Sequence, residues 1–228
     1  MQESGRSEYV SVPRMVELHA REVGGLWFGL AHAGASLAAT AVGPTRETTV
    51  DSLRRSLPPG IGFRVTDAAA SEFVEKTIAQ LVELEAGHEG HKEFSLAPDC
   101  IAEPFAAILR VAAAIPLGYV TTYGDVGRTA GAEARDVGSA MARNPLYPIV
   151  PCHRVVGADF ALVGYGGSRG ETALRAKLDR LTREVRGFRE EREVPVDGRS
   201  LRVYPVERVI ARAQKRGRGE GRQRSLFE

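Results

Sequence analysis

Apolar residues alternate in part with polar ones through residues 15–42. Val16 and Leu18 open the pattern, and Leu26, Phe28 and Leu30 continue it. Alternation of this kind is typical of half-buried strands, and glycine is typical of the turns between them. The turn glycines are Gly24, Gly25 and Gly34. The pattern therefore predicts a small antiparallel meander.

Two helices are expected after the meander. The first covers residues 49–57, because Pro58-Pro59-Gly60 ends it. The second should begin at Thr66-Asp67, a polar start signal, and end at Gly87. Its apolar stripe consists of Phe73, Ile78, Leu81, Val82 and Leu84. Residues 86–98 are then a polar linker, so we predict a small α+β N-terminal domain over residues 1–93.

The second half of the chain begins with an apolar helix over residues 103–114 and a turn into a short segment at 120–123. Two short helices follow, over 123–129 and 133–143, with Gly131 between them. A helix, a glycine turn and a second helix form a helix-turn-helix outline.

The rest of the sequence, from residue 162 onward, predicts a loop, a helix, a hairpin and a tail. Residues 162–170 are glycine-rich but lack the lysine and spacing of a phosphate-binding loop, so they suit a wall around a flat ligand. A helix over 171–185 is followed by a hairpin at 194–204 with an Asp-Gly turn. We place the second domain at 94–205 and a basic, flexible tail at 206–228.

The small-residue face of the 133–143 helix needs an explanation. Spacings of three and four put one set of residues on one face: Gly131, Ala134, Arg135, Gly138 and Ala142. Val137, Ala140 and Met141 turn toward a core. Glycine costs a helix about 1 kcal/mol relative to alanine, so Gly138 requires a reason. Close approach to a large flat partner and tight helix–helix packing both supply one.

Net charge is only +2 and is unevenly placed. From Ile210 onward there are six basic and two acidic residues, which leaves 25 basic and 27 acidic residues before it. A nearly neutral body excludes a broad basic face, so any nucleic-acid contact must be local. The tail either attracts phosphate without sequence preference or only solubilises the protein.

Composition also indicates the compartment in which the protein works. The chain has no apolar run of 18 residues, and residues 1–12 are polar without a signal-peptide core, so we expect a cytoplasmic protein. Cys100 and Cys152 could pair, but a reactive thiol in a reducing compartment is the simpler interpretation. His88 and His91 could ligate a metal, but nothing completes a site. We therefore expect a solvated linker and no metal.

The residues from Asn144 to Val156 carry the candidate chemistry. Asn144-Pro145 stops the preceding helix, and two further prolines stiffen the approach to Cys152. His153 follows directly. A thiolate is the nucleophilic form of cysteine, and a neighbouring base promotes its formation. On the Cys-His pair alone, a buried structural cysteine at a strand edge is the preferred interpretation.

The complete stretch is more specific. Asn144-Pro145 followed by Pro151-Cys152-His153-Arg154-Val155 closely resembles the active-site signature of the O6-alkylguanine-DNA alkyltransferases. The resemblance covers about residues 94–185. It implies an RNase H-like α/β N-terminal domain and a mainly helical C-terminal domain with a winged-helix-like helix-turn-helix. It further implies irreversible, single-turnover transfer of an alkyl group from flipped-out O6-alkylguanine to Cys152. The implied partner is double-stranded DNA, bound through its minor groove by a monomer without a cofactor.

The resemblance also assigns roles to single residues. Cys152 matches the alkyl acceptor, His153 the group that takes the thiol proton through a water, and Asn144 the brace of the active-site turn. Arg135 matches the arginine that enters the base stack, with Ala134, Gly138 and Ala142 beside it against the groove. Tyr123 matches the tyrosine that promotes flipping and is a candidate proton donor to the leaving guanine. The pocket would be lined by Tyr165, Gly166, Met141 and Val155.

Two glutamates compete to orient His153. The family pattern of Leu-x-x-Lys, a leucine and then Glu fits Leu174, Lys177, Leu181 and Glu184, if the glycine-rich loop carries about five extra residues. Arg180 then stands where the family has leucine. Glu171 is the other candidate, and we favour Glu184.

Two other functions remain open. A non-catalytic binder of alkylguanine could use the same fold, but such relatives lack the cysteine that is present here. A Cys-His hydrolase of another class would draw its histidine from a distant segment. Neither alternative explains Arg135 and Asn144 together.

Overall fold

The computed structural model describes residues 15–66, 70–89 and 94–224, and side chains up to residue 215. The polar start at 1–12, Asp67 and His91 lie outside the described residues. The described part contains no helix that is both long enough and apolar enough to cross a membrane.

The first half of the chain forms a five-stranded sheet with the order β4-β1-β2-β3-β5. Its strands are β1 (Met15–Val23), β2 (Leu26–Ala33), β3 (Ser36–Gly43), β4 (Gly62–Val65) and β5 (Ser95–Leu96). The predicted antiparallel meander β1-β2-β3 is confirmed. The sequence did not indicate β4 and β5, which pair in parallel with β1 and β3. Because β5 joins this sheet, the first structural unit extends slightly past residue 93.

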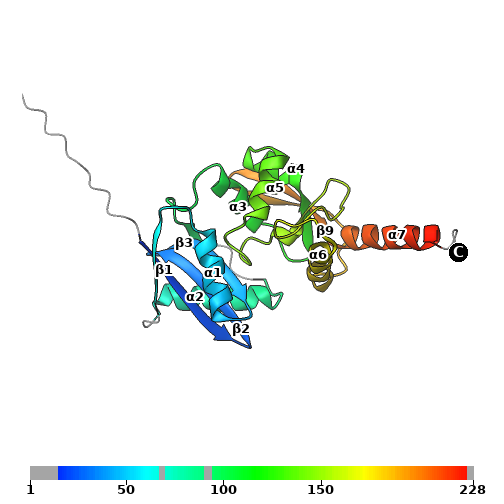
Figure 1. The fold of residues 1–228 in the computed structure, drawn as a ribbon. Coiled ribbons are helices and arrows are strands. Elements are labelled where there is room, and N and C mark those ends of the chain that lie inside the picture. Colours follow the sequence, from blue (N-terminus) through cyan, green and yellow to red (C-terminus); the bar gives the residue numbers. More distant parts are fainter. Residues whose placement is uncertain (1–14, 67–69, 90–93, 225–228) are drawn as a thin grey trace, which may run out of the picture.

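Two helices cover opposite faces of this sheet (Figure 1). Helix α1 (Arg46–Ser56) begins earlier than predicted, since Thr45 and Thr48 form a capping box. Helix α2 (Glu72–Glu85) begins after the N-cap Ser71, so the predicted start at Thr66-Asp67 is wrong. The Thr66 amide instead donates to the Leu18 carbonyl, which continues the pairing beyond β4.

The second half contains the predicted helix-turn-helix pair. After α3 (Phe105–Ala113), helices α4 (Tyr123–Ala130) and α5 (Ala134–Ala142) pack against each other and against α3. Thr122 caps α4 by accepting from the Asp125 amide, and Gly131 ends it in the left-handed conformation with φ 74°.

A second sheet accompanies these helices, so this half is less helical than expected. Its strand order is β7-β6-β9-β8. The strands are β6 (Tyr119–Thr122), β7 (Val155–Val156), β8 (Arg192–Val196) and β9 (Arg199–Pro205). The predicted hairpin β8-β9 is confirmed, and its turn residues Asp197 and Gly198 both have positive φ.

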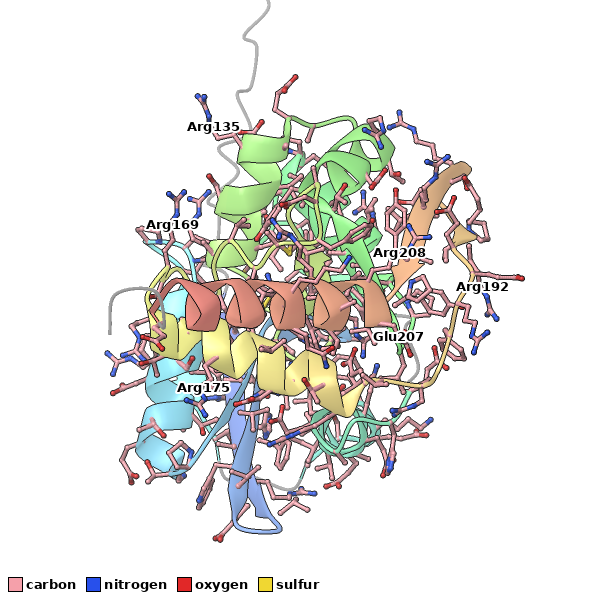
Figure 2. The ribbon with its side chains drawn as sticks, turned by 90° about the vertical axis from the view of Figure 1, so that its right-hand side faces the viewer. Arg135, Arg169, Arg175, Arg192, Glu207 and Arg208 are labelled. Atoms are coloured by element: carbon pink, nitrogen blue, oxygen red, sulfur yellow. The ribbon has the colours of Figure 1, made fainter. Side chains whose placement is uncertain are left out.

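The segment predicted as a basic, flexible tail from residue 206 is helical over most of its described length. Residues Glu207–Arg224 form helix α7, which lies beside α6 (Glu171–Arg183) (Figure 2). Val206 and Val209 are buried with Val120, Val156 and Leu181. This apolar contact fixes the start of α7, which glycine and charge content alone would disfavour.

The two halves contact each other beside the active-site stretch. The Thr40 amide donates to the Pro145 carbonyl at 2.7 Å, and the Thr40 hydroxyl donates to the Tyr147 carbonyl at 2.9 Å. The Tyr147 hydroxyl and Arg180 both donate to Glu85 at the end of α2. The segment that leads to Cys152 is thus held by strand β3 and helix α2.

Candidate active site

Cys152 opens a single helical turn, Cys152–Arg154, between the proline-framed segment and β7. Asn144 braces the segment from inside: its amide donates to the Val150 carbonyl at 2.7 Å, and its carbonyl accepts from the Leu146 amide at 3.0 Å. The thiol is 8% exposed. The cross-braced turn therefore holds a largely buried thiol in a fixed position.

Cys152 lines a pocket of about 790 Å³ between α5 and the glycine-rich loop. Nine of the expected site residues line it: Tyr123, Ala134, Arg135, Gly138, Met141, Ala142, Cys152, Tyr165 and Gly166. Val155, expected in the pocket, is instead fully buried in the core and is not among the lining residues. Six further lining residues were not singled out individually: Ser139, Val163, Gly164, Gly167, Ser168 and Arg169. Most belong to the loop that the sequence indicated as a ligand wall.

Behind the pocket, His153, Arg154 and Glu184 form a buried cluster. His153 Nε2 lies 2.8 Å from Glu184 Oε1, and Arg154 donates two hydrogen bonds to the same carboxylate at 2.8 and 2.9 Å. A third Arg154 hydrogen bond reaches the Ile115 carbonyl. Glu171 is exposed in the first turn of α6. Of the two candidate glutamates, Glu184 is therefore the one in contact with His153.

The electrostatics of the cluster favour a neutral histidine. Burial raises the pKa of Glu184, but the hydrogen bonds from His153 and Arg154 outweigh it and lower the pKa to about 2. Burial lowers the pKa of His153, against the opposing effect of Glu184. A neutral His153 donates its Nε2 proton to Glu184. Its Nδ1 is buried without a hydrogen-bond partner among the described residues, so it is free to accept a proton.

Lys177 supplies a buried positive charge near the thiol. Its Nζ donates to the Val155 carbonyl at 2.6 Å and to the Gly164 carbonyl at 3.1 Å. Burial lowers the pKa of Lys177 to about 8. Burial raises the pKa of Cys152, and the Asn144 amide and the Lys177 charge counteract this. The sequence indicates Lys177 only as part of the Leu-x-x-Lys pattern. Its two partners lie far along the chain, on β7 and in the glycine-rich loop.

Two tyrosines face the thiol from either side of the pocket. Burial, with a smaller contribution from Cys152, raises the pKa of Tyr123. Burial raises the pKa of Tyr165 to about 12. Both phenols therefore keep their protons at neutral pH and can donate hydrogen bonds to a group in the pocket.

The small-residue face of α5 borders the pocket and is open. Ala134, Arg135 and Ala142 are exposed, whereas Val137, Ala140 and Met141 are buried as predicted. A Cβ added at Gly138 would meet no atom within 4 Å. Tight packing within the chain is therefore not the reason for Gly138. Figure 2 shows Arg135 and Arg169 at the same edge of the molecule, pointing outward.

The structure also describes the two cysteines and His88, the other candidates for a disulfide or a metal site. Cys100 and Cys152 are both free. His88 lies 2.7 Å from Glu83, an exposed pair at the end of α2. A cysteine thiol in a pocket that a helix-turn-helix pair borders is typical of a nucleic-acid-binding protein with a cysteine nucleophile.

Comparisons with known proteins agree with this class. Residues 103–186 match the family model described as 6-O-methylguanine DNA methyltransferase, DNA binding domain. The methylated-DNA–protein-cysteine methyltransferase of Mycobacterium leprae is 34% identical over 127 residues, which cover 54% of this chain and 73% of that protein. The protein of the same name from Pyrobaculum aerophilum is 58% identical over 53 residues, or 23% of this chain and 36% of that protein.

A solved structure extends the likeness to both halves. Mycobacterium tuberculosis OGT in complex with DNA superposes with a TM-score of 0.53 and 25% identity over 74% of this chain and 92% of that one. The chain belongs to the methylated-DNA–protein-cysteine methyltransferase family.

Proposed function

We propose that this protein repairs O6-alkylguanine in duplex DNA by moving the alkyl group onto Cys152, once and irreversibly. The observation that carries the proposal is the shared pocket, which is lined both by the buried Cys152 and by the exposed Arg135 of α5. The proposal needs no cofactor, because the thiol is itself the acceptor.

Helix α5 would dock in the minor groove. The O6 atom of guanine is buried in the duplex, so the base must be turned out of the stack at a cost of a few kcal/mol. Arg135 would fill the vacated space, and the small residues beside it would permit close approach. A nearly neutral body suits a contact with few phosphates. Arg135→Ala should therefore slow transfer from duplex DNA far more than transfer from the free base O6-benzylguanine.

The flipped base would then occupy the pocket, with Tyr165 and Gly166 on the loop side and Met141 on the α5 side. The Cys152 proton passes through a water to His153 Nδ1, and Glu184 holds the imidazole in the accepting tautomer. The thiolate attacks the alkyl carbon, a C–S bond forms and the C–O bond breaks. The bonding electrons leave with guanine, which takes a proton from Tyr123. The resulting thioether is inert, so each molecule acts once.

The finer architecture is part of the same proposal. We assign the first half, up to β5, to an RNase H-like domain, and the β8-β9 hairpin to the wing of a winged helix. We further propose that the protein acts as a cytoplasmic monomer.

Intact-protein mass spectrometry tests the function. The protein is incubated with a duplex that carries O6-methylguanine, beside Cys152→Ala and a matched Cys100→Ala variant. We expect the wild type and Cys100→Ala to gain one methyl group, mapped to Cys152, and Cys152→Ala to gain none. Tight duplex binding without a change in mass would favour the alkylguanine binder instead, and methylation at Cys100 would refute the assignment of the acceptor.

A further inference from the structure

A second cluster of ligating side chains lies on the first sheet, away from Cys152. Glu17 of β1 is the direct partner of His32 on β2, and His19 lies two residues further along β1, on the same face. The two imidazoles stack with centroids 5.2 Å apart, and Phe73 of α2 packs on His32 at 5.4 Å. One ligating atom from each of Glu17, His19 and His32 lies within 4.8 Å of the others.

The hydrogen bonding of His32 indicates a missing ligand. Its Nδ1 lies 2.7 Å from the Gly34 carbonyl, so this nitrogen carries the proton and donates it. The other nitrogen, Nε2, is therefore an acceptor, and it is buried with no partner among the described residues. His32 is 7% exposed. An unsatisfied buried polar atom destabilises the folded state, and a ligand from outside the chain would satisfy it.

We propose that Glu17, His19 and His32 bind one divalent transition metal ion, with zinc the best fit. Two imidazoles and one carboxylate form a common zinc ligand set that leaves one position for water. A histidine that donates Nδ1–H to a backbone carbonyl and offers Nε2 is the usual arrangement of a metal-bound imidazole.

The surroundings of the other two ligands are consistent with the site. His19 Nε2 lies 3.7 Å from Glu17 Oε2, and Arg64 of β4 donates to the other Glu17 oxygen. Arg64 would orient the carboxylate. Small side-chain rotations would bring the three ligand atoms closer to a shared metal ion, because zinc bonds to nitrogen and oxygen are about 2.0–2.2 Å long.

The metal would have a structural role. It would join β1 to β2 at His32, beside the point where the pairing of β2 with β3 shifts register. Binding to the folded state alone would raise the stability of the first sheet and leave the chemistry of Cys152 unchanged.

The test is a titration of chelator-treated full-length protein with Zn²⁺, followed by native mass spectrometry and thermal unfolding, and with Co²⁺, followed by visible absorption. Cys152→Ala serves as the background, so that this thiol cannot ligate the metal. We expect one bound ion, the absorption of tetrahedral Co²⁺ and a higher Tm with Zn²⁺. His32→Gln and Glu17→Gln should each weaken binding by at least about tenfold, because even the loss of an outer-shell partner costs 10–100-fold.

The matched control is His88→Gln, which removes an exposed histidine outside the cluster and should bind as the background protein does. Glu17 is part-exposed, so Glu17→Gln keeps the test valid if His32→Gln does not fold. Absence of stoichiometric binding would overturn the proposal. So would binding that survives both cluster variants, or binding that His88→Gln abolishes.

Discussion

Two buried charged residues act on the reacting groups: Glu184 contacts His153, and Lys177 counteracts the effect of burial on the pKa of Cys152. Glu184 receives hydrogen bonds from both His153 and Arg154, and Lys177 is bonded only to carbonyl oxygens. Buried charges are stable only when such partners compensate for lost hydration. Each residue therefore couples the chemistry of the thiol to the stability of the fold.

Glu184→Gln should remove an acid-sensitive part of the stability. The folded-state pKa of Glu184 is about 2, below its ordinary value of 4.5. Its contribution is therefore complete above pH 4.5 and is lost as the pH falls toward 2. The shift corresponds to roughly 3 kcal/mol. We expect Glu184→Gln to lower the free energy of unfolding at pH 7 and to narrow its difference from wild type below pH 4.5, as measured by urea denaturation at several pH values.

The matched control for this experiment is Glu171→Gln, on the exposed start of α6. It should show the pH dependence of the wild type. If the difference in free energy of unfolding between Glu184→Gln and wild type stays constant from pH 7 to pH 3, the pairing of Glu184 with His153 and Arg154 is contradicted.

Lys177→Met should displace the pH profile of alkyl transfer to higher pH. The Lys177 charge counteracts the burial that raises the pKa of Cys152, so its loss leaves less thiolate at a given pH. Because less of the thiol is then ionised, we expect the single-turnover rate at pH 7 to fall. Arg175→Met, on the exposed face of the same helix (Figure 2), should retain the wild-type profile. An unshifted profile in Lys177→Met would exclude this role.

At the scale of elements, the helix-turn-helix could be predicted because its signals are local. Thr122 and Gly131 delimit α4 within the segment itself, and the Asp197-Gly198 turn fixes the hairpin register. Strands β4 and β5 are short and pair with distant partners, so no local period indicates them. Helix α7 depends on the burial of Val206 and Val209 against three other elements, which the local composition does not reveal.

Helix α5 gives a prediction that separates stability from binding. Gly138→Ala should raise the free energy of unfolding by up to about 1 kcal/mol, because alanine is the better helix former and its Cβ meets no neighbour. The Gly138→Ala variant should bind duplex DNA less tightly than wild type, because its helix face is less open. The larger side chain of Gly138→Leu should raise the Kd by at least about tenfold. Fluorescence anisotropy with a lesion duplex, beside chemical denaturation, measures both quantities.

Gly127→Ala in α4 is the contrasting variant. Its added Cβ would lie 2.5 Å from the Ala132 carbonyl oxygen, so it should destabilise the fold. If Gly138→Leu binds the lesion duplex as tightly as wild type does, α5 is not the element that faces DNA.

At the scale of the whole molecule, the first half of the chain supports the site through contacts that only the folded chain brings together. Glu85 is separated from Tyr147 by 62 residues and from Arg180 by 95. Arg180, where the family pattern has leucine, lies over the Tyr147 ring at 4.9 Å. Burial raises the pKa of Tyr147, so its hydroxyl stays protonated and donates to Glu85. The Cys152 motif could be identified from sequence, but this support could not, because none of its spacings is local.

Glu85→Ala tests whether that support matters for chemistry. The substitution leaves the Tyr147 hydroxyl and the Arg180 guanidinium without their shared acceptor, which should lower the free energy of unfolding by about 1–3 kcal/mol. Since Tyr147 lies in the braced segment before Cys152, single-turnover alkyl transfer should slow as well. Glu83→Ala is the matched control, because Glu83 lies on the same helix and pairs only with the exposed His88 among the contacts described.

The free energy of unfolding and the rate of alkyl transfer together distinguish a brace of the active site from a contact that only stabilises the fold. If Glu85→Ala is as stable and as fast as Glu83→Ala, helix α2 does not brace the site. A loss of stability with unchanged transfer would mean that the hydrogen bonds of Asn144 and Thr40 hold the segment without help from α2. A loss of both would show that the first sheet acts on the thiol through α2, because Glu85 reaches Cys152 only through Tyr147 and Arg180.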